Sequence, residues 1–267
     1  MYNQKPAKNL FWDLGNTLIS MNTLSFARKL GLFDLCVYSL DHRAVSTKIF
    51  NKALDLLAQL DVASTQPCKA TAQGRPLPDV VCQWLTGNIK TAQVRSFLDK
   101  PFIDRYPHNF FANNREARLV EKFLKTLADP QALTSTLKVI KAGKVLLQEC
   151  AEQYDYDGDQ RHRLFVLSNW DPYSLNLMID DLRLKEVFNY FHKQNLIISG
   201  DIGLVKPEDD LYSYVLTRYK LNPSDCILID DQIENIEGAQ KHGMNGILLK
   251  DRNYKEVRNI LRVYDVI

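Results

Sequence analysis

The chain is 267 residues long, and its 45% hydrophobic and 25% charged residues are typical of a globular protein with enough apolar residues for a large core. The formal net charge is only +2, and lysine and arginine are evenly mixed with aspartate and glutamate. We therefore expect neither a nucleic acid nor an acidic membrane surface as a partner.

Cysteine usage and the N-terminal sequence predict a cytoplasmic protein. The cysteines are odd in number and widely spaced, without a CxxC pair, so reduced thiols are expected. The first residues contain no uninterrupted apolar segment of the kind found in signal peptides, and no apolar run approaches the ~20 residues that span a bilayer. The cysteines are Cys36, Cys68, Cys82, Cys150 and Cys226.

The first predicted element is a buried strand, NLFWD (9–13), an apolar run that ends at Asp13. From about residue 20 to 130, apolar residues recur instead at helical spacing, in three stripes. Within this region the segment 61–78, rich in Ser, Thr, Gly and Pro, predicts a long loop. We therefore expect an all-helical inserted domain over residues 21–129. The stripes are Ile49, Ala53, Leu57 and Leu60, then Val81, Trp84, Leu85, Ile89 and Ala92, and finally Val120, Phe123, Leu124 and Leu127.

After the insertion, helices and strands alternate along the chain. This order is typical of an α/β fold with a doubly wound parallel sheet, so the core is expected to comprise residues 1–20 and 130–267. In such sheets ligands bind at the carboxyl ends of the strands. The predicted elements are a helix over 132–154, strands at 163–169 and 195–199, a helix after Lys206, a strand at 226–231, a helix over 233–242 and a strand at 246–249.

Polar side chains stand at three of these strand ends, namely Asp13, Ser168 and the pair Asp230 and Asp231. Each also has a purely structural explanation. Asp13 is a residue type that forms turns, one of the two later aspartates suits the N-cap of the next helix, and Ser168 with Asn169 can be loop residues. Their placement at one edge of the sheet is what indicates a site.

Lys206 comes just before a predicted helix, in the segment GLVKPEDDLY. Pro207 suits the first turn of a helix, which would set Lys206 at the positive end of the helix dipole. This position is unfavourable unless an anion offsets it, and the alternative is a solvated lysine of a surface loop. Together, the carboxylates can hold a hard divalent cation, while Ser168, backbone amides and Lys206 can hold a phosphate.

In order and spacing, these segments resemble the four motifs of the haloacid dehalogenase-like (HAD) hydrolases. FWDLGNT resembles the first motif, with Asp13 as the nucleophile, and VLSN resembles the second, with Ser168. GLVKP resembles the third, with Lys206, and LIDDQIEN the fourth, with Asp230 and Asp231. The resemblance implies a Rossmann-like core whose cap domain is inserted between the first two motifs, where the helical insertion is predicted.

The resemblance also implies a phosphohydrolase chemistry in which Asp13 attacks a small phosphorylated substrate and forms an aspartyl-phosphate. The implied cofactor is Mg²⁺, held by the side chains of Asp13 and Asp231 and by the backbone carbonyl of Gly15. Asp230 is expected to lie next to these ligands and to position them without binding the metal, with Asn235 as a polar neighbour. The residues implied to bind the substrate are Ser168, Asn169, Lys206 and Asn16.

Gly15 departs from the usual first motif, in which a second aspartate protonates the departing alcohol. Three interpretations follow. The protein can be a phosphatase similar to the D-L-G-N-type sugar-phosphate phosphatases, acting where the leaving group needs little help. It can be a 2-haloacid dehalogenase, although those enzymes resemble D-x-Y-G-T here and lack the adjacent acids of the fourth motif. It can also be a phosphometabolite-binding or partner-binding protein without catalysis. Metal-dependent turnover of a phosphate ester would distinguish an enzyme from this non-catalytic protein.

Other features carry less information. YDYDGD (154–159) resembles the start of a calcium loop but lacks its downstream glutamate, so an acidic connection is expected. Trp170 can line a substrate pocket or pack beneath the cap. No pattern predicts the number of subunits. The cap residues considered for contact with the substrate are His42, Arg43, Lys48, Arg75 and Arg95.

Overall fold

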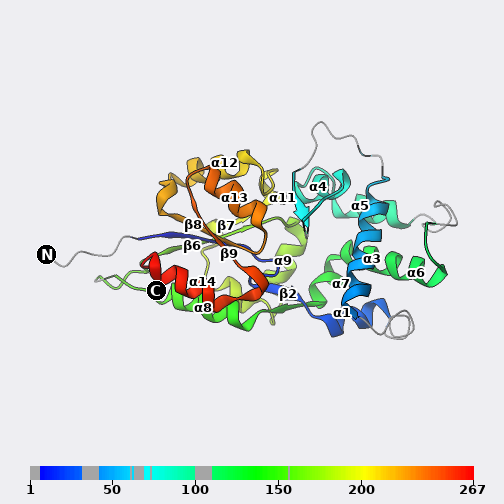
Figure 1. The fold of residues 1–267 in the computed structure, drawn as a ribbon, viewed down its shortest axis with the longest axis horizontal. Coiled ribbons are helices and arrows are strands. Elements are labelled where there is room, and N and C mark those ends of the chain that lie inside the picture. The colour runs from blue at the N-terminus through cyan, green and yellow to red at the C-terminus, as the bar shows by residue number, and fades with distance from the viewer. Residues whose placement is uncertain are drawn as a thin grey trace.

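The computed structural model describes residues 7–31, 42–60, 62, 69–72, 74–99, 110–155 and 157–267, with the backbone alone for residues 42–46 and 99. A sheet flanked by helices forms one side of the molecule, and a group of helices lies beside it (Figure 1). None of the helices in these ranges is long and apolar enough to cross a membrane.

The core is a five-stranded parallel sheet in the order β7-β6-β1-β8-β9, so the predicted doubly wound parallel sheet is confirmed. The central strand, β1, pairs with β6 on one side and with β8 on the other. Its carboxyl end points toward the helical part of the molecule (Figure 1). The strands are β1 (Asn9–Trp12), β6 (Arg163–Ser168), β7 (Leu196–Ile198), β8 (Cys226–Asp230) and β9 (Asn245–Leu248).

Both faces of the sheet are buried, because alternate residues of β1 enter different apolar clusters. Leu10 and Trp12 pack with α8, α9 and α14 on one face. Phe11 packs with α12 and α13 on the other and stacks on Phe165 at 4.6 Å between ring centroids. The core helices are α8 (Lys141–Ala151), α9 (Pro172–Asp180), α10 (Lys185–Phe188), α11 (Ser199–Ile202), α12 (Asp209–Tyr219), α13 (Ile233–Lys241) and α14 (Tyr254–Val263), with short 3₁₀ turns at Lys193–Asn195, Pro223–Asp225 and Lys250–Arg252.

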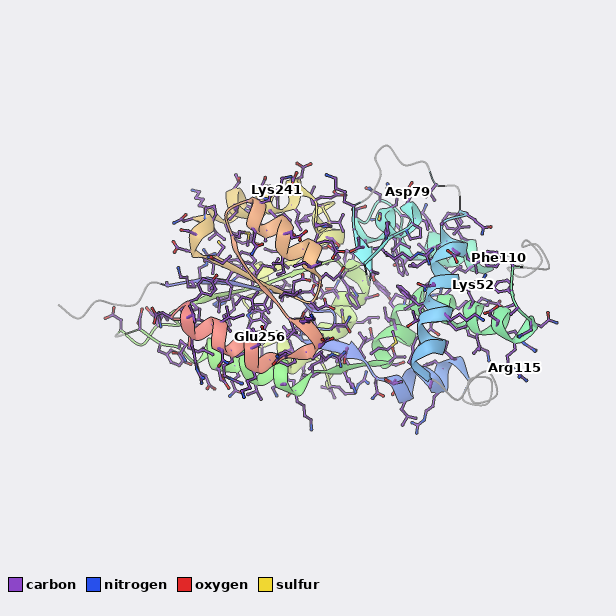
Figure 2. The ribbon with its side chains drawn as sticks, in the orientation of Figure 1. Lys52, Asp79, Phe110, Arg115, Lys241 and Glu256 are labelled. Atoms are coloured by element: carbon purple, nitrogen blue, oxygen red, sulfur yellow. The ribbon has the colours of Figure 1, made fainter. Side chains whose placement is uncertain are left out.

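The segment between the first strand and the rest of the sheet is helical, as predicted, and has an apolar cluster of its own. Figure 2 shows Lys52 and Phe110 together in this part, where the lysine Nζ donates to the Phe110 carbonyl oxygen at 2.7 Å and lies 4.2 Å from the ring centroid. We call this segment the cap; its exact boundaries stay a prediction. Its helices are α1 (Thr23–Leu30), α3 (His42–Leu57), α4 (Asp79–Leu85), α5 (Thr91–Asp99) and α6 (Asn114–Leu127), and α7 (Pro130–Ser135) follows at the predicted start of the second core segment.

The two chain segments that join the cap to the sheet run side by side. β2 (Ile19–Met21) pairs antiparallel with β5 (Leu137–Val139). The pairing is extended at one end, where the Ile140 N–H donates to the Leu18 carbonyl oxygen at 2.8 Å. The single helix predicted over 132–154 is therefore wrong in its middle, because residues 137–139 make their hydrogen bonds to β2 and separate α7 from α8.

Two predictions for the cap also need correction. The expected loop over 61–78 contains a short hairpin, with β3 (Thr71–Ala72) paired to β4 (Arg75–Pro76). The stripe from residue 81 to 92 is divided between α4 and α5, because Gly87 has a φ of 74° and ends the helical path. A Cβ at Gly87 would lie 2.5 Å from the Gly200 carbonyl oxygen, so this glycine also allows the cap to approach the core closely.

The expectation of reduced cysteines is wrong at Cys82, which is joined in a disulfide. Cys36 and Cys68 lie outside the described residues. Spacing and number failed as criteria because a disulfide requires only that two cysteines come within bonding distance in the fold. Cys150 and Cys226 are free and buried, and burial raises the pKa of each thiol to about 12, so both stay protonated near neutral pH.

A buried histidine, His162, connects the two ends of the chain. Its Nδ1 accepts a hydrogen bond from the Lys8 backbone N–H at 3.1 Å, and its Nε2 lies 2.9 Å from the Val266 carbonyl oxygen. These contacts suit a neutral ring whose Nε2 carries the proton. Burial lowers the pKa of His162 to about 4. The ring is therefore held uncharged at the pH values where the protein is expected to work.

We predict that His162 makes the protein less stable as the pH falls. The unfolded histidine binds a proton near pH 6.5 but the folded one only near pH 4, so the free energy of unfolding should fall by roughly 3 kcal/mol between these values. Urea denaturation at several pH values would measure it. Carboxylates also titrate in this pH range, so the same measurement is made on His162→Gln. The free energy of unfolding of this variant should change less with pH. Parallel curves for the two proteins would contradict the assignment.

Candidate active site

Asp13, which directly follows β1, lies in contact with Ser168 at the end of β6 and with Lys206 in the loop before α12. Its backbone N–H still donates to the Ile229 carbonyl oxygen at 3.0 Å, so the sheet fixes its position. Its Oδ1 accepts hydrogen bonds from Ser168 Oγ at 3.0 Å and from Lys206 Nζ at 2.7 Å. Among the described residues, none donates to Oδ2. The structure thus brings the first three predicted motifs together around one carboxylate oxygen.

Asp230, at the end of β8, is paired to the same lysine. Lys206 Nζ lies 2.5 Å from Asp230 Oδ2, and Asn235 Nδ2 donates to both oxygens of Asp230 at 3.0 and 3.1 Å. The Gln232 backbone N–H donates to Oδ1 at 2.9 Å. Because these donors occupy both oxygens of Asp230, its position fits the expected support of the site from behind. The N-cap of α13 is Gln232 and not an aspartate.

Lys206 is buried, with 1% of its surface exposed, so the alternative of a solvated surface lysine is wrong. The helix-dipole explanation is wrong as well, because α12 begins at Asp209 with Glu208 as its N-cap, and Pro207 lies before the helix. Burial by itself lowers the pKa of Lys206, but the charges of Asp13 and Asp230 outweigh it and hold the pKa above its ordinary value. Two carboxylates, and not a helix dipole, hold this cation.

Asn169 positions Lys206 through its backbone. The Asn169 side chain donates to the Lys206 carbonyl oxygen at 2.9 Å and accepts from the Lys206 N–H at 2.8 Å. This pairing ties the loop after β6 to the loop before α12. The amide keeps one N–H and one oxygen lone pair beyond this pairing, so the contact of Asn169 with substrate stays a prediction. The sequence offers no sign of the pairing, since 37 residues separate the two positions.

Asp231 lies beside Asp230 and is less buried. Burial, followed by the charge of Asp230, raises the pKa of Asp231 to about 6, and a side-chain hydrogen bond from Asn16 opposes the shift. Asn16, expected to bind substrate, therefore contacts the predicted metal ligand. Arg252 Nη2 lies 3.3 Å from the Asn16 Oδ1. Sequence reasoning missed Arg252 because it belongs to no motif and follows Asn16 by 236 residues.

The charges around Asp13 favour binding of a cation. Burial, with the charges of Asp230 and Asp231, raises the pKa of Asp13 to about 7, although Lys206 opposes the shift. Three carboxylates thus lie near one lysine, which is paired with two of them. No cluster of three or more His, Cys, Asp or Glu side chains suited to a metal occurs in the described ranges. The predicted ligand set has only two carboxylates and a carbonyl, which is a usual protein contribution to a Mg²⁺ site.

Gly15 leaves room for a small side chain next to the carboxylate. A Cβ at Gly15 would lie 3.6 Å from Asp13 Oδ2 and 3.9 Å from the ring of Trp170, which are ordinary van der Waals distances. Its φ is not in the left-handed region, so the backbone does not require glycine. Trp170 is half-buried and packs against the apolar cluster of the core on this side. The indole Nε1 of Trp170 is buried without a hydrogen-bond partner among the described residues.

The cap residues considered for substrate contact are placed differently from one another. Lys48 pairs with the buried Glu116 at 2.9 Å, and Arg75 pairs with Asp55, so both are engaged within the cap. Arg95 lines a cavity between the cap and the core, away from Asp13. The side chains of His42 and Arg43 lie outside the described residues.

The acidic segment 154–159 is a turn in the structure. Asp155 Oδ1 accepts the backbone N–H groups of Asp157 and Asp159, each at 3.0 Å. Aspartates that accept such local hydrogen bonds are typical of turns. The predicted acidic connection therefore agrees with the geometry of this segment.

We expect Lys206→Met to lower the free energy of unfolding by about 3–5 kcal/mol in buffer without divalent cations, because Asp13 and Asp230 would be buried without their partner. Urea denaturation measures the loss, with Lys255→Met on the exposed surface of α14 as the matched control. Adding Asp230→Asn to Lys206→Met should recover part of the stability, since one unpaired charge is removed. A double variant that is no more stable than the single one would show that the carboxylates are not the cause.

Comparison with known proteins identifies a protein family that matches this chain. A family model described as haloacid dehalogenase-like hydrolase matches residues 81–249, which is more than half of the chain and includes Ser168, Lys206 and Asp231. Bifunctional epoxide hydrolase 2 of Rattus norvegicus is 37% identical over 60 residues, which cover 22% of this chain. The match spans only 11% of the length of the rat protein.

Solved structures share the fold at low sequence identity. A HAD family enzyme of Bacteroides thetaiotaomicron, an aspartate-to-alanine mutant in complex with magnesium and inorganic phosphate, is 17% identical with a TM-score of 0.53, and the match covers 90% of this chain and 93% of that one. A dehalogenase with an intermediate complex is 13% identical with a TM-score of 0.53, over 94% of this chain and 88% of that one. At these identities the likeness concerns the fold and does not separate one chemistry from the other.

Proposed function

The chain belongs to the haloacid dehalogenase-like hydrolase family, and from this premise we propose that it is a magnesium-dependent phosphohydrolase acting on a small phosphorylated metabolite. The observation that carries the proposal is the geometry of Asp13. Its Oδ1 is held by Ser168 and Lys206, while Oδ2 has no hydrogen-bond donor among the described residues. A carboxylate held in this way keeps one oxygen available as a nucleophile.

In the proposed reaction, Asp13 attacks the phosphorus atom of the substrate and the bond to the leaving oxygen breaks. The product of this step is an aspartyl-phosphate, which water then hydrolyses to regenerate the carboxylate. Lys206 and Ser168, both donors to the same carboxylate oxygen, are placed to orient it and to stabilise negative charge on the transferring group. The sheet holds Asp13 rigidly, because its backbone N–H continues the ladder to β8.

The residues present fit a magnesium ion, since three carboxylates around a single lysine leave an excess of negative charge. Asp13 and Asp231 would hold the ion with the Gly15 carbonyl, while Asp230 is already used by Lys206 and Asn235. When bound, Mg²⁺ neutralises charge on the phosphoryl group and on the attacking carboxylate. The related enzyme of Bacteroides thetaiotaomicron, crystallised with magnesium and inorganic phosphate, supports this choice of ion.

Gly15 narrows the proposed substrate class. With no acid at this position, the leaving group should depart without a proton from the neighbouring residue, so acyl phosphates and sugar 1-phosphates are favoured over phosphates of simple alcohols. The same observation supports a second candidate, a phosphometabolite-binding or partner-binding protein that does not turn over its ligand. A 2-haloacid dehalogenase is less well supported, because the excess of carboxylates has no use in a reaction without a metal.

A screen of phosphate esters and acyl phosphates, with and without Mg²⁺, tests the proposed activity. We predict that Asp231→Asn weakens Mg²⁺ binding at least about tenfold and lowers the hydrolysis rate at subsaturating Mg²⁺, because the ion loses a charged ligand. Calorimetric titration with Mg²⁺ measures the first effect. Asp251→Asn, on an exposed residue near the end of β9, is the matched control. Unchanged affinity in Asp231→Asn would remove Asp231 from the metal site.

A further inference from the structure

A cavity with a volume of about 570 Å³, which we call the seam cavity, lies between the cap and the core. The cap contributes the end of α4 and the start of α5, and the core contributes the first residue of α7, the start of α9 and Gly200 of α11. Asp13, Ser168, Lys206 and Asp231 do not line it. The volume is within the range of small-molecule binding sites.

The wall of this seam cavity is largely apolar and includes flat side chains. Trp84 and Ile89 come from the cap, and Pro172 and Tyr173 from the core. The Trp84 indole N–H donates to Thr91 Oγ1 at 2.9 Å, which fixes the orientation of the ring. Tyr173 is 57% exposed, so part of its ring is accessible to a ligand. A ligand with a flat apolar body would cover these surfaces from both domains at once.

The charges that line the seam cavity are unbalanced. Lys90 and Arg95 are exposed, and neither has an ion-pair partner in the described part of the chain. The acid among the lining residues is Asp171, and its Oδ1 is engaged by the Ser174 N–H at 2.9 Å and by the Thr91 hydroxyl at 3.5 Å. Two cations beside an apolar wall are complementary to an amphipathic anion.

We propose that the seam cavity binds a small amphipathic anion, that is, a flat apolar ring system carrying one carboxylate or phosphate. The ring would lie between Trp84 of the cap and Tyr173 of the core, and the anionic group would pair with Lys90 and Arg95. This site is distinct from the Asp13 site, and the inference does not depend on the proposed hydrolysis.

A ligand in the seam cavity would hold the cap against the core, because the lining residues adjoin the hydrogen bonds between the two. Ser199 Oγ donates to the Leu85 carbonyl oxygen of the cap at 2.7 Å and accepts the Trp170 N–H of the core at 3.0 Å. Gly200, next to Ser199, lines the cavity and lies against Gly87. Binding should therefore raise the melting temperature of the whole protein, since the ligand bridges both parts.

The test uses 2-naphthoate as the probe and the full chain, with calorimetric titration as the measurement. We expect a Kd below about 1 mM for 2-naphthoate and much weaker binding of the neutral 2-naphthylmethanol. The double variant Lys90→Gln with Arg95→Gln should weaken 2-naphthoate binding about tenfold or more, since charge-assisted contacts are lost. The matched control is Lys29→Gln with Arg118→Gln, two exposed cap cations that do not line the cavity.

Two further measurements decide between the seam cavity and other places of binding. Ala92→Trp should abolish 2-naphthoate binding by placing an indole in the cavity without a change in charge. This variant replaces the double variant as the test if the double variant does not fold. Saturating inorganic phosphate with Mg²⁺ should leave 2-naphthoate binding unchanged. Displacement by phosphate, equal binding by both double variants, or no binding to the unmodified protein would each overturn the proposal.

Discussion

Asp13→Asn is expected to lower kcat/KM for phosphate-ester hydrolysis by about 10⁴-fold or more, because an amide oxygen is a poor nucleophile and the proposed reaction has no other attacking group on the enzyme. The substitution keeps the size of the side chain and lets Oδ1 continue to accept from Ser168 and Lys206. The fold should therefore survive. Steady-state hydrolysis of an aryl phosphate in the presence of Mg²⁺ measures the loss.

The matched control is Asp180→Asn, on an exposed residue at the end of α9, which should retain full activity. Melting temperatures of both variants separate a catalytic defect from a structural one. Retention of most of the rate in a folded Asp13→Asn protein would show that another group is the nucleophile, or that water attacks the substrate directly. An unmodified protein without turnover, but with Mg²⁺-dependent binding of phosphate, would favour the non-catalytic alternative.

Gly15→Asp is expected to raise the turnover of alkyl phosphates by about 10²-fold, with a smaller effect on aryl and acyl phosphates, because only the alkyl leaving group needs a proton in the transition state. The structure supports the design of this variant. A Cβ at Gly15 meets its nearest atoms at 3.6 and 3.9 Å, and the backbone is not in the left-handed region. Nearby carboxylates should raise the pKa of the new acid and keep it protonated.

The decisive quantity for Gly15→Asp is the ratio of the alkyl to the aryl rate, compared with that of Gly15→Asn. The asparagine fills the same space but cannot act as a general acid. In the unmodified protein, slow hydrolysis of the aspartyl-phosphate should give a burst of product before the steady state, because the second step also lacks a base. Equal rates for alkyl and aryl phosphates without a burst would mean that another residue supplies the proton.

The apolar runs in the sequence determined the architecture of the core. Strands buried on both faces must be apolar at nearly every position, so NLFW, RLFVLS and CILID predict a parallel sheet without knowledge of their neighbours. Because the carboxyl ends of parallel strands lie at one edge of the sheet, the sequence alone predicted that Asp13, Ser168 and Asp230 lie close together. Geometric rules of the fold class were sufficient here because they are independent of side-chain detail.

Local patterns were misleading where long-range pairing decides the structure. Residues 137–139 have helical spacing but form a strand, because β2, more than 100 residues earlier, supplies hydrogen-bond partners. Cys82 forms a disulfide although no spacing rule suggests one. In each case the decisive partner is distant in the sequence, and no periodicity within a short window reports it.

The charge state and the contacts of the site were decided only by the tertiary structure. The sequence by itself identified Lys206 but attributed it to a helix dipole, whereas the fold buries it between Asp13 and Asp230. It identified Asn169 and Asn16 as substrate contacts, and the fold adds the contacts of Asn169 with the Lys206 backbone and of Asn16 with Asp231, which no local pattern reports. Residue types and strand ends are encoded locally, but burial and pairing depend on which loops the folded chain brings together, and these set the electrostatics of the site.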